Sequence, residues 1–281
     1  LTFFCFVIQI LFIFGFCIAR PHPSSALSVD DLPQWRFYST SDGFREAWSY
    51  SITIGSSGEA IVTHGSVDSM SVYGGYFVQP IPSLNMKFTA RQSPNGRIWS
   101  NHWNSDLNRN YGMAYYDPEA KRWISIEIPE VQACNETLDT RFLPVADDCI
   151  LILLPECLYL FQLDTHQMTR IQLEENGGIG LFSQIILSRD NGAWIAGERG
   201  IAKILPSQGR YDPDANWVEY SFGTDSDYER IENLFEYPSN RIYGSAMQKS
   251  TGKRVLLVLE GDEWKEDRKS TRLNSSHTIQ S

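Results

Sequence analysis

The sequence predicts an all-β protein, a β-propeller of four-stranded antiparallel blades with about five blades present in an incomplete ring. Turn-plus-apolar units recur along the chain, and their hydrophobic anchors lie 38, 53, 42 and 49 residues apart. Such a spacing is typical of blade-sized repeats of roughly 40 to 50 residues. Convincing helical periodicity is absent from residues 35 to 266. The anchors are Ile61, Trp99, Ile152, Trp194 and Tyr243.

The first 19 residues are apolar and uncharged, and a Pro/Ser-rich linker follows over residues 20–34. Cys17 and Ala19 are small enough to precede a signal-peptidase cut before Arg20. An uncleaved membrane anchor is the alternative, because a stretch of this length can just span a bilayer. Phe16 stands where a lipoprotein signal needs a small residue. We therefore expect either an export signal or an anchor.

Five segments supply the first half of a repeat, a turn that leads into a short apolar strand. The clearest is SRDNGAWIAGERGIAKI, in which a polar turn precedes Trp194 and a second turn precedes Ile201. Gly and Asn favour such turns because they tolerate positive φ. The five segments are 56–65, 93–103, 146–161, 188–204 and 238–247.

The second half of a repeat begins with Tyr-Asp-Pro and continues into an alternating strand that contains Trp. Clear copies lie in 112–128 and 204–222, and 161–173 is a degenerate one. Asp-Pro initiates a turn because proline fixes φ and the Asp side chain bonds nearby backbone. One repeat is thus strand, Gly turn, strand, Asp-Pro turn and outer strand. The positions that define it are Gly96, Trp99, Asp117, Trp123, Gly192, Trp194, Asp212 and Trp217.

The segment 35–44 (WRFYSTSDGF) resembles 217–226 (WVEYSFGTDS), so we expect an N-terminal outer strand that completes the last blade. A single repeat is too small to fold alone. Burying one Trp of roughly 200 Å² gives about 5 kcal/mol, whereas ordering each residue's backbone costs about 1 to 2 kcal/mol. Neighbouring sheets must therefore cover each other's faces.

The pattern S-x-D-G-x-x-W, followed by G-h-x-x-Y-D-P and W-x-x-Y, resembles the repeats of two-component-regulator propellers. These form the extracytoplasmic sensor region of bacterial hybrid histidine kinases. The resemblance covers about 35–266, but only two of the five repeats match well. Cys149 and Cys157 stand where the fourth repeat has Gly192 and Gly200, and Asn240 replaces the turn glycine of the fifth.

The resemblance implies a fragment of a sensor that signals through a phosphorelay, with two consecutive propellers, a β-sandwich, a membrane helix and cytoplasmic kinase and receiver domains. Residues 267–281 resemble a translated sequencing adapter, so we expect an artefactual, disordered tail and a native chain that continues past Glu266. The implied location is the periplasm or cell envelope, with a tether to the inner membrane in the full-length protein. The implied assembly is a homodimer, and contact with the membrane would come only from the N-terminal segment or a missing C-terminal helix.

Composition and spacing exclude several other functions. A net charge of −10 and a pI near 5.0 argue against nucleic-acid binding, which needs clustered Lys and Arg. The four histidines ahead of the tail lie far apart and match no metal motif, so we expect no metal and no cofactor. They are His22, His64, His102 and His166.

Catalysis is not expected in the region present. The turn Ser188–Trp194 resembles a sialidase Asp-box with one residue missing, but that box is a structural turn, and spacing cannot supply the further groups that a glycosidase needs. Outside the N-terminal segment, Cys134, Cys149 and Cys157 allow at most one disulfide and leave one free thiol. Cys149 and Cys157 fall on adjacent predicted strands, where they could pair or remain free thiols.

The insertion NHWNSDLNRNY (101–111) is the best candidate for ligand contact, because it places an aromatic ring among amides, a carboxylate and a guanidinium on a predicted connection. Sugars bind such groups by stacking and by hydroxyl hydrogen bonds. An ordinary solvated loop with Trp103 packed beneath it is the alternative. The candidates are His102, Trp103, Asn104, Asp106, Arg109 and Tyr111, together with the charged tip Glu198 and Arg199.

These expectations combine into a non-catalytic, extracytoplasmic sensor that binds an oligo- or polysaccharide and relays the signal by rearranging a dimer. An exported propeller enzyme, either a lyase or a glycoside hydrolase, is one alternative. A soluble carbohydrate-binding module is another.

Overall fold

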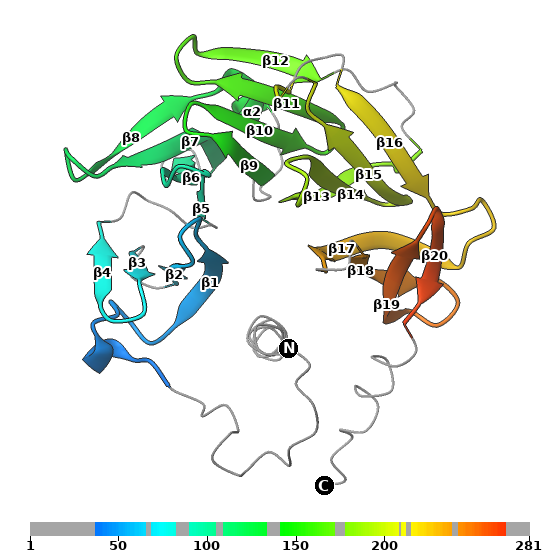
Figure 1. The fold of residues 1–281 in the computed structure, drawn as a ribbon, viewed down its shortest axis with the longest axis horizontal. Coiled ribbons are helices and arrows are strands. Elements are labelled where there is room, and N and C mark those ends of the chain that lie inside the picture. Colours follow the sequence, from blue (N-terminus) through cyan, green and yellow to red (C-terminus); the bar gives the residue numbers. More distant parts are fainter. Residues whose placement is uncertain are drawn as a thin grey trace, which may run out of the picture. The chain divides into compact units, whose positions relative to one another are not determined.

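The structure, a computed structural model, describes residues 37–65, 69–82, 90–104, 109–133, 141–171, 178–207, 209–211, 215–237 and 241–267. It contains five four-stranded antiparallel sheets arranged as a five-blade β-propeller (Figure 1). Each sheet is built from four consecutive strands in chain order, and the described chain has almost no helix. The predicted fold class is confirmed.

The sheets are numbered here in chain order. Sheet 1 comprises Ser49–Ile54 (β1), Ala60–His64 (β2), Met70–Tyr73 (β3) and Val78–Ile81 (β4). Sheet 2 comprises Ala90–Gln92 (β5), Ile98–Asn104 (β6), Arg109–Asp117 (β7) and Arg122–Glu127 (β8). Sheet 3 comprises Arg141–Ala146 (β9), Cys149–Leu154 (β10), Cys157–Gln162 (β11) and Gln167–Ile171 (β12). Sheet 4 comprises Phe182–Leu187 (β13), Ala193–Gly197 (β14), Gly200–Leu205 (β15) and Asn216–Ser221 (β16). Sheet 5 comprises Tyr228–Glu236 (β17), Ile242–Gln248 (β18), Lys253–Glu260 (β19) and Glu263–Glu266 (β20).

Within the described residues, two short helices accompany the sheets, a 3-10 helix Thr40–Asp42 (η2) and an α-helix Pro129–Ala133 (α2). None of the helices in the described residues has the length and apolarity that a bilayer crossing needs. The N-terminal export or anchor segment, the linker 20–34 and all but the first residue of the tail 267–281 lie outside the described residues.

Four apolar clusters fill the spaces between neighbouring sheets. Trp99 on β6 packs with Phe142 and Ile150 of sheet 3, and Trp194 on β14 packs with residues of sheet 5. The two tryptophans thus occupy like positions, each on a second strand and facing the next sheet. The side chain of Trp99 is fully buried and that of Trp194 is 6% exposed.

A tryptophan on the fourth strand of three sheets packs in the opposite direction, toward the preceding sheet. Trp123, Trp217 and Trp264 belong to the sheet 1–2, sheet 3–4 and sheet 4–5 clusters respectively. The indole Nε1 of Trp123 donates to the carbonyl of Pro82 at 2.6 Å, and that of Trp264 to the carbonyl of Tyr220 at 3.0 Å. Sheets 2 and 4 therefore each carry a packed tryptophan on both faces.

One predicted anchor is wrong by a single residue. Ile152 packs with Trp99 against sheet 2, whereas its neighbour Leu151 packs against sheet 4. Successive side chains of a strand point to opposite faces, so a shift of one residue reverses the face. Leu151 is therefore the residue of sheet 3 that corresponds to Trp99 and Trp194.

The expected N-terminal outer strand is also wrong for the part of residues 35–44 that the structure describes. Thr40–Asp42 forms η2, because Ser39 and Asp42 make a reciprocal capping box and Gly43 ends the helix with φ 101°. Sheet 5 takes its fourth strand, β20, from its own repeat.

The order of strands in each sheet defines two ends of the propeller. The turns between the first and second strands and between the third and fourth strands lie at one end, here called the turn end. The hairpins between the second and third strands lie at the other, here called the hairpin end. At the turn end, neighbouring sheets are hydrogen-bonded: Ser93 Oγ donates to Asp147 Oδ1, and the backbone N–H of Arg189 donates to Glu236 Oε2 at 2.9 Å.

Candidate functional site

The predicted loop 101–111 is largely strand. β6 continues to Asn104 and β7 begins at Arg109, so the residues predicted on a connection lie mostly on a hairpin. The register shifts between His102 and Trp103, and Trp103 is only 5% exposed. The Trp103 ring is therefore not a surface for stacking, and its packing matches the alternative considered from sequence. Asp106 and the side chains of Asn104 and Arg109 lie outside the described residues.

His102 and Tyr111 meet at the hairpin end of sheet 2. Their ring centroids are 5.2 Å apart and the rings lie edge to face at 75°. The Tyr111 hydroxyl donates a hydrogen bond of 2.8 Å to Glu127 Oε2. Burial lowers the pKa of His102, so its imidazole is neutral at physiological pH.

Helix α2 adds an amide to this group. Gln132 Nε2 donates to Glu127 Oε1 at 2.9 Å and to the carbonyl of Tyr111 at 3.2 Å. Val131, which is 1% exposed, anchors the helix in the core between sheets 2 and 3. The four residues His102, Tyr111, Glu127 and Gln132 are called the Tyr111 cluster below.

Close backbone approach positions the cluster. Gly112 has φ 156°, and a Cβ there would lie 2.1 Å from the carbonyl oxygen of Ile126. The end of β8 therefore lies directly against β7, and the Ile128 N–H bonds the Tyr111 carbonyl at 3.2 Å. This contact brings Glu127 to the Tyr111 hydroxyl.

The hydrogen bonds fix the charge state of the cluster. Gln132, and then Tyr111, lower the pKa of Glu127, while the bond to Glu127 raises the pKa of Tyr111. The cluster thus presents a carboxylate and an amide beside two aromatic rings, a phenol and a neutral imidazole. Such groups can accept and donate hydrogen bonds to hydroxyls and can stack on an apolar face.

Sequence reasoning named His102 and Tyr111 but missed Glu127 and Gln132. The available signal was Ile128-Pro129-Glu130 at the end of a strand, since proline followed by an acidic residue is typical of a first helical turn.

Glu198 and Arg199 form the hairpin tip of sheet 4, at the same end of the propeller but two sheets away from the cluster. Their backbone N–H groups donate to the carbonyls of Leu181 and Ile179 at 3.1 and 2.8 Å, and Arg230 N–H donates to the Glu198 carbonyl at 2.6 Å. The tip thus links sheets 4 and 5. Both side chains are exposed.

The Asp and Gly residues that define the repeat and lie within the described chain help to form the turns at the turn end of the propeller. Asp117 Oδ1 accepts the backbone N–H groups of Glu119 and Ala120 at 3.0 and 3.1 Å, as the Asp-Pro turn predicts. Gly192 N–H donates to Asp190 Oδ1 at 3.2 Å, and Gly96 has φ 103°. Asp212 lies outside the described residues.

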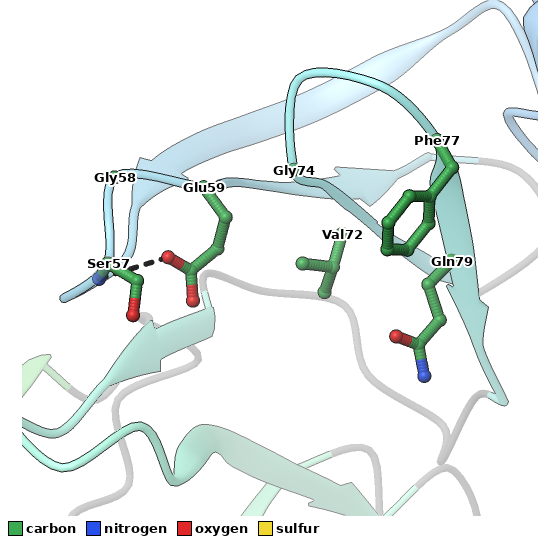
Figure 2. Close-up of a pocket in the computed structure, with 7 residues that line it drawn as sticks. All are labelled: Ser57, Gly58, Glu59, Val72, Gly74, Phe77 and Gln79. Carbon is green, nitrogen blue, oxygen red and sulfur yellow. Dashed lines mark hydrogen bonds between the residues drawn. The ribbon is translucent and has the colours of Figure 1, made fainter.

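A cavity of about 320 Å³ lies at the turn end of sheet 1, and sequence reasoning named none of its residues. Figure 2 shows Glu59 on one side, Phe77 and Gln79 on the other, and Val72 between them. Glu59 Oε1 accepts a hydrogen bond of 2.8 Å from Gln92 Nε2, and Oε2 accepts one of 3.1 Å from the Ser57 N–H. The lining residues are Ser57, Gly58, Glu59, Val72, Gly74, Phe77 and Gln79.

Among the described residues, no group of three or more His, Cys, Asp or Glu side chains could hold a metal ion. His64 is a core residue: its Nε2 hydrogen-bonds Ser71 Oγ at 2.8 Å, and both side chains are buried. Cys149 and Cys157 are both free and lie at opposite ends of the β10–β11 hairpin, so they do not pair with each other. Cys134 lies outside the described residues.

Comparison with known proteins finds similarity of fold. No protein-family model matches this chain, and no curated protein matches it. A solved structure described as the extracellular domain of a hybrid two component system from B. thetaiotaomicron has a TM-score of 0.50 and 15% identity; the match covers 78% of this chain but only 27% of that one. A streptogramin B lyase structure has a TM-score of 0.52 and 14% identity, covering 76% of this chain and 66% of that one. In fold, the chain is a β-propeller similar to both the extracellular domain of a two component system and a lyase.

Proposed function

We propose that this propeller is the extracytoplasmic ligand-sensing part of a two-component signalling protein and that it binds a glycan at the hairpin end. The observation that carries the ligand proposal is the Tyr111 cluster. Its carboxylate is held by two hydrogen bonds beside two partly buried rings. Groups that are already oriented bind hydroxyls with a smaller entropy cost than free side chains do.

The sensor role is supported by the repeat pattern around Trp99 and Trp194 and by the likeness in fold to a two-component ectodomain. In this proposal the complete protein is an exported, membrane-tethered homodimer. Ligand shifts the arrangement of the two subunits, and only a difference in its affinity for the two arrangements can drive that shift.

The ligand proposal is tested by calorimetric titration of the full chain with a panel of polysaccharides. Glu127→Gln removes the charge of the cluster, and we expect it to weaken binding about tenfold. Glu119→Gln makes the same charge change in the β7–β8 turn, at the other end of sheet 2, and should bind like the wild type. If no polysaccharide binds, or if the two variants behave alike, the ligand proposal is wrong.

The sensor role has its own test, the gene sequence beyond codon 266. A membrane span followed by histidine-kinase sequence is expected. A stop codon soon after this position would overturn the sensor role and leave a soluble binding module or an enzyme.

A lyase is the second candidate function, favoured by the likeness in fold to streptogramin B lyase and by the neutral imidazole of His102. A neutral imidazole can accept a proton from substrate. Incubation with the same polysaccharides distinguishes the candidates. A sensor leaves them intact, whereas a lyase releases unsaturated products, and His102→Gln should abolish that release.

A further inference from the structure

We infer that the cavity in sheet 1 is a second binding site, which takes a small organic cation, an ammonium group on an apolar body. It lies at the turn end, opposite the Tyr111 cluster, because it is lined by the β1–β2 and β3–β4 turns of sheet 1. Its volume of about 320 Å³ is within the usual range of small-molecule sites.

The charge of the cavity favours a cation. Glu59 is held by two neutral donors, the Gln92 amide and the Ser57 N–H, which orient the carboxylate without neutralising it. No Lys, Arg or His in the described chain forms an ion pair with Glu59, and none is among the lining residues. One uncompensated carboxylate thus faces the cavity.

The orientation of Glu59 is fixed by the next sheet. Gln92 lies on β5, and its Oε1 accepts hydrogen bonds from the N–H and hydroxyl of Ser56 at 2.5 and 3.1 Å. Its Nε2 also donates to the carbonyl of Gly96 at 3.0 Å. Because all polar atoms of the Gln92 amide are engaged, the carboxylate is held in place before any ligand arrives.

The opposite wall suits the body of such a ligand. The Phe77 side chain is 67% exposed, and Figure 2 shows its ring on the side of the cavity facing Glu59, with Val72 between the two. An aromatic face attracts an ammonium group, and Val72 offers an apolar surface to its substituents. A neutral sugar could donate hydroxyl hydrogen bonds to Glu59 but carries no positive charge to pair with the carboxylate.

The probes are choline and 3,3-dimethyl-1-butanol (below, dimethylbutanol), in which an uncharged carbon replaces the nitrogen of choline. Glucose represents a neutral sugar. In NMR titrations of the full chain, choline should perturb resonances around Glu59 and Phe77 and bind at least about tenfold more tightly than dimethylbutanol. Equal binding of the two isosteres, or binding of glucose in place of choline, would overturn the inference.

Two variants locate the site. Glu59→Gln should weaken choline binding at least about tenfold, and Phe77→Leu about two- to fivefold. Glu119→Gln removes a carboxylate at the same end of the neighbouring sheet and should leave binding unchanged. If Glu59→Gln unfolds the protein, the inference is still tested by choline binding to Phe77→Leu and by the comparison of choline with dimethylbutanol on the wild type. Failure here would leave the glycan and sensor proposals untouched, because those depend on the hairpin end.

Discussion

Gly200 lets two strands of sheet 4 approach more closely than any side chain permits. Its φ is 155°, and a Cβ would lie 2.4 Å from the carbonyl oxygen of Tyr220. In sheet 3 the corresponding residue is Cys157. Leu158 pairs with Ile171 on β12, and residues 172–177, which follow Ile171, lie outside the described chain.

We therefore expect Gly200→Ala to destabilise the protein by about 2 to 4 kcal/mol, through strain at positive φ and a backbone shift. Gly223→Ala is the control, because a Cβ there meets nothing within 4 Å. Urea denaturation measures both variants. Equal free energies of unfolding would contradict the close approach.

The thiol of Cys149 should be unreactive in the folded protein. Burial, and then the charge of Asp148, raise its pKa to about 11, so very little thiolate is present at neutral pH. We expect alkylation by iodoacetamide, followed by mass spectrometry, to modify Cys149 slowly in buffer and rapidly in concentrated urea. Rapid modification under native conditions would show that the burial is wrong.

At the scale of the element, predicting a strand such as β10 requires both its position in the sequence and the face on which each side chain lies. The repeat spacing located β10 correctly, but the choice of Ile152 over Leu151 assigned the anchor to the wrong face. All six residues of β10, Cys149–Leu154, are apolar, so the strand shows no polar–apolar alternation from which its two faces could be assigned. The sequence does not show which neighbouring sheet packs against each face of β10, because that depends on the tertiary structure.

A pair of double-mutant cycles tests this assignment. We expect Leu151→Ala to couple with Ile185→Ala on β13, and Ile152→Ala to couple with Trp99→Leu on β6, by at least about 0.5 kcal/mol each. Each single variant should cost about 2 to 5 kcal/mol, because the residues are fully buried. Urea denaturation of the singles and doubles provides the data. Coupling of Leu151 with Trp99 instead would reverse the faces.

The Tyr111 cluster shows a different limit of sequence reasoning. His102 and Tyr111 were identified from composition, but the contact of Tyr111 with Glu127 depends on a helix of five residues and a close strand approach. A helix this short has no periodicity to detect, and its stability comes from the packing of Val131. The sequence identifies residues with suitable chemical groups, whereas the tertiary packing determines which of these residues come into contact.

At the scale of the whole molecule, two histidines make the stability of the fold depend on pH. Burial lowers the pKa of His64, although Glu46 and the backbone of Trp48 oppose the shift, and burial lowers the pKa of His102. In the unfolded chain both return toward 6.5. As the pH falls through this value the unfolded state binds protons first, so the free energy of unfolding decreases.

The free energy of unfolding should therefore be lower at about pH 5.5 than at about pH 7.5, and the decrease should continue until the pH reaches the folded-state pKa values. The double variant His64→Gln, His102→Gln should show a smaller difference between the two conditions. Urea denaturation at each pH provides the measurement. An undiminished difference in the double variant would assign the effect to other groups.

Every ladder in the described chain joins strands that are adjacent in sequence, so the connections between sheets contribute no pairing of their own. A chain cleaved between sheet 3 and sheet 4 would keep all five sheets. Its two pieces would meet through side-chain packing and through hydrogen bonds such as the one from the Phe182 N–H to the carbonyl of Pro155 at 2.8 Å, as the subunits of a dimer do. Fragment complementation and circular permutation are thus open to this topology. The blade is the unit that recombination can add, remove or exchange without breaking a strand pair.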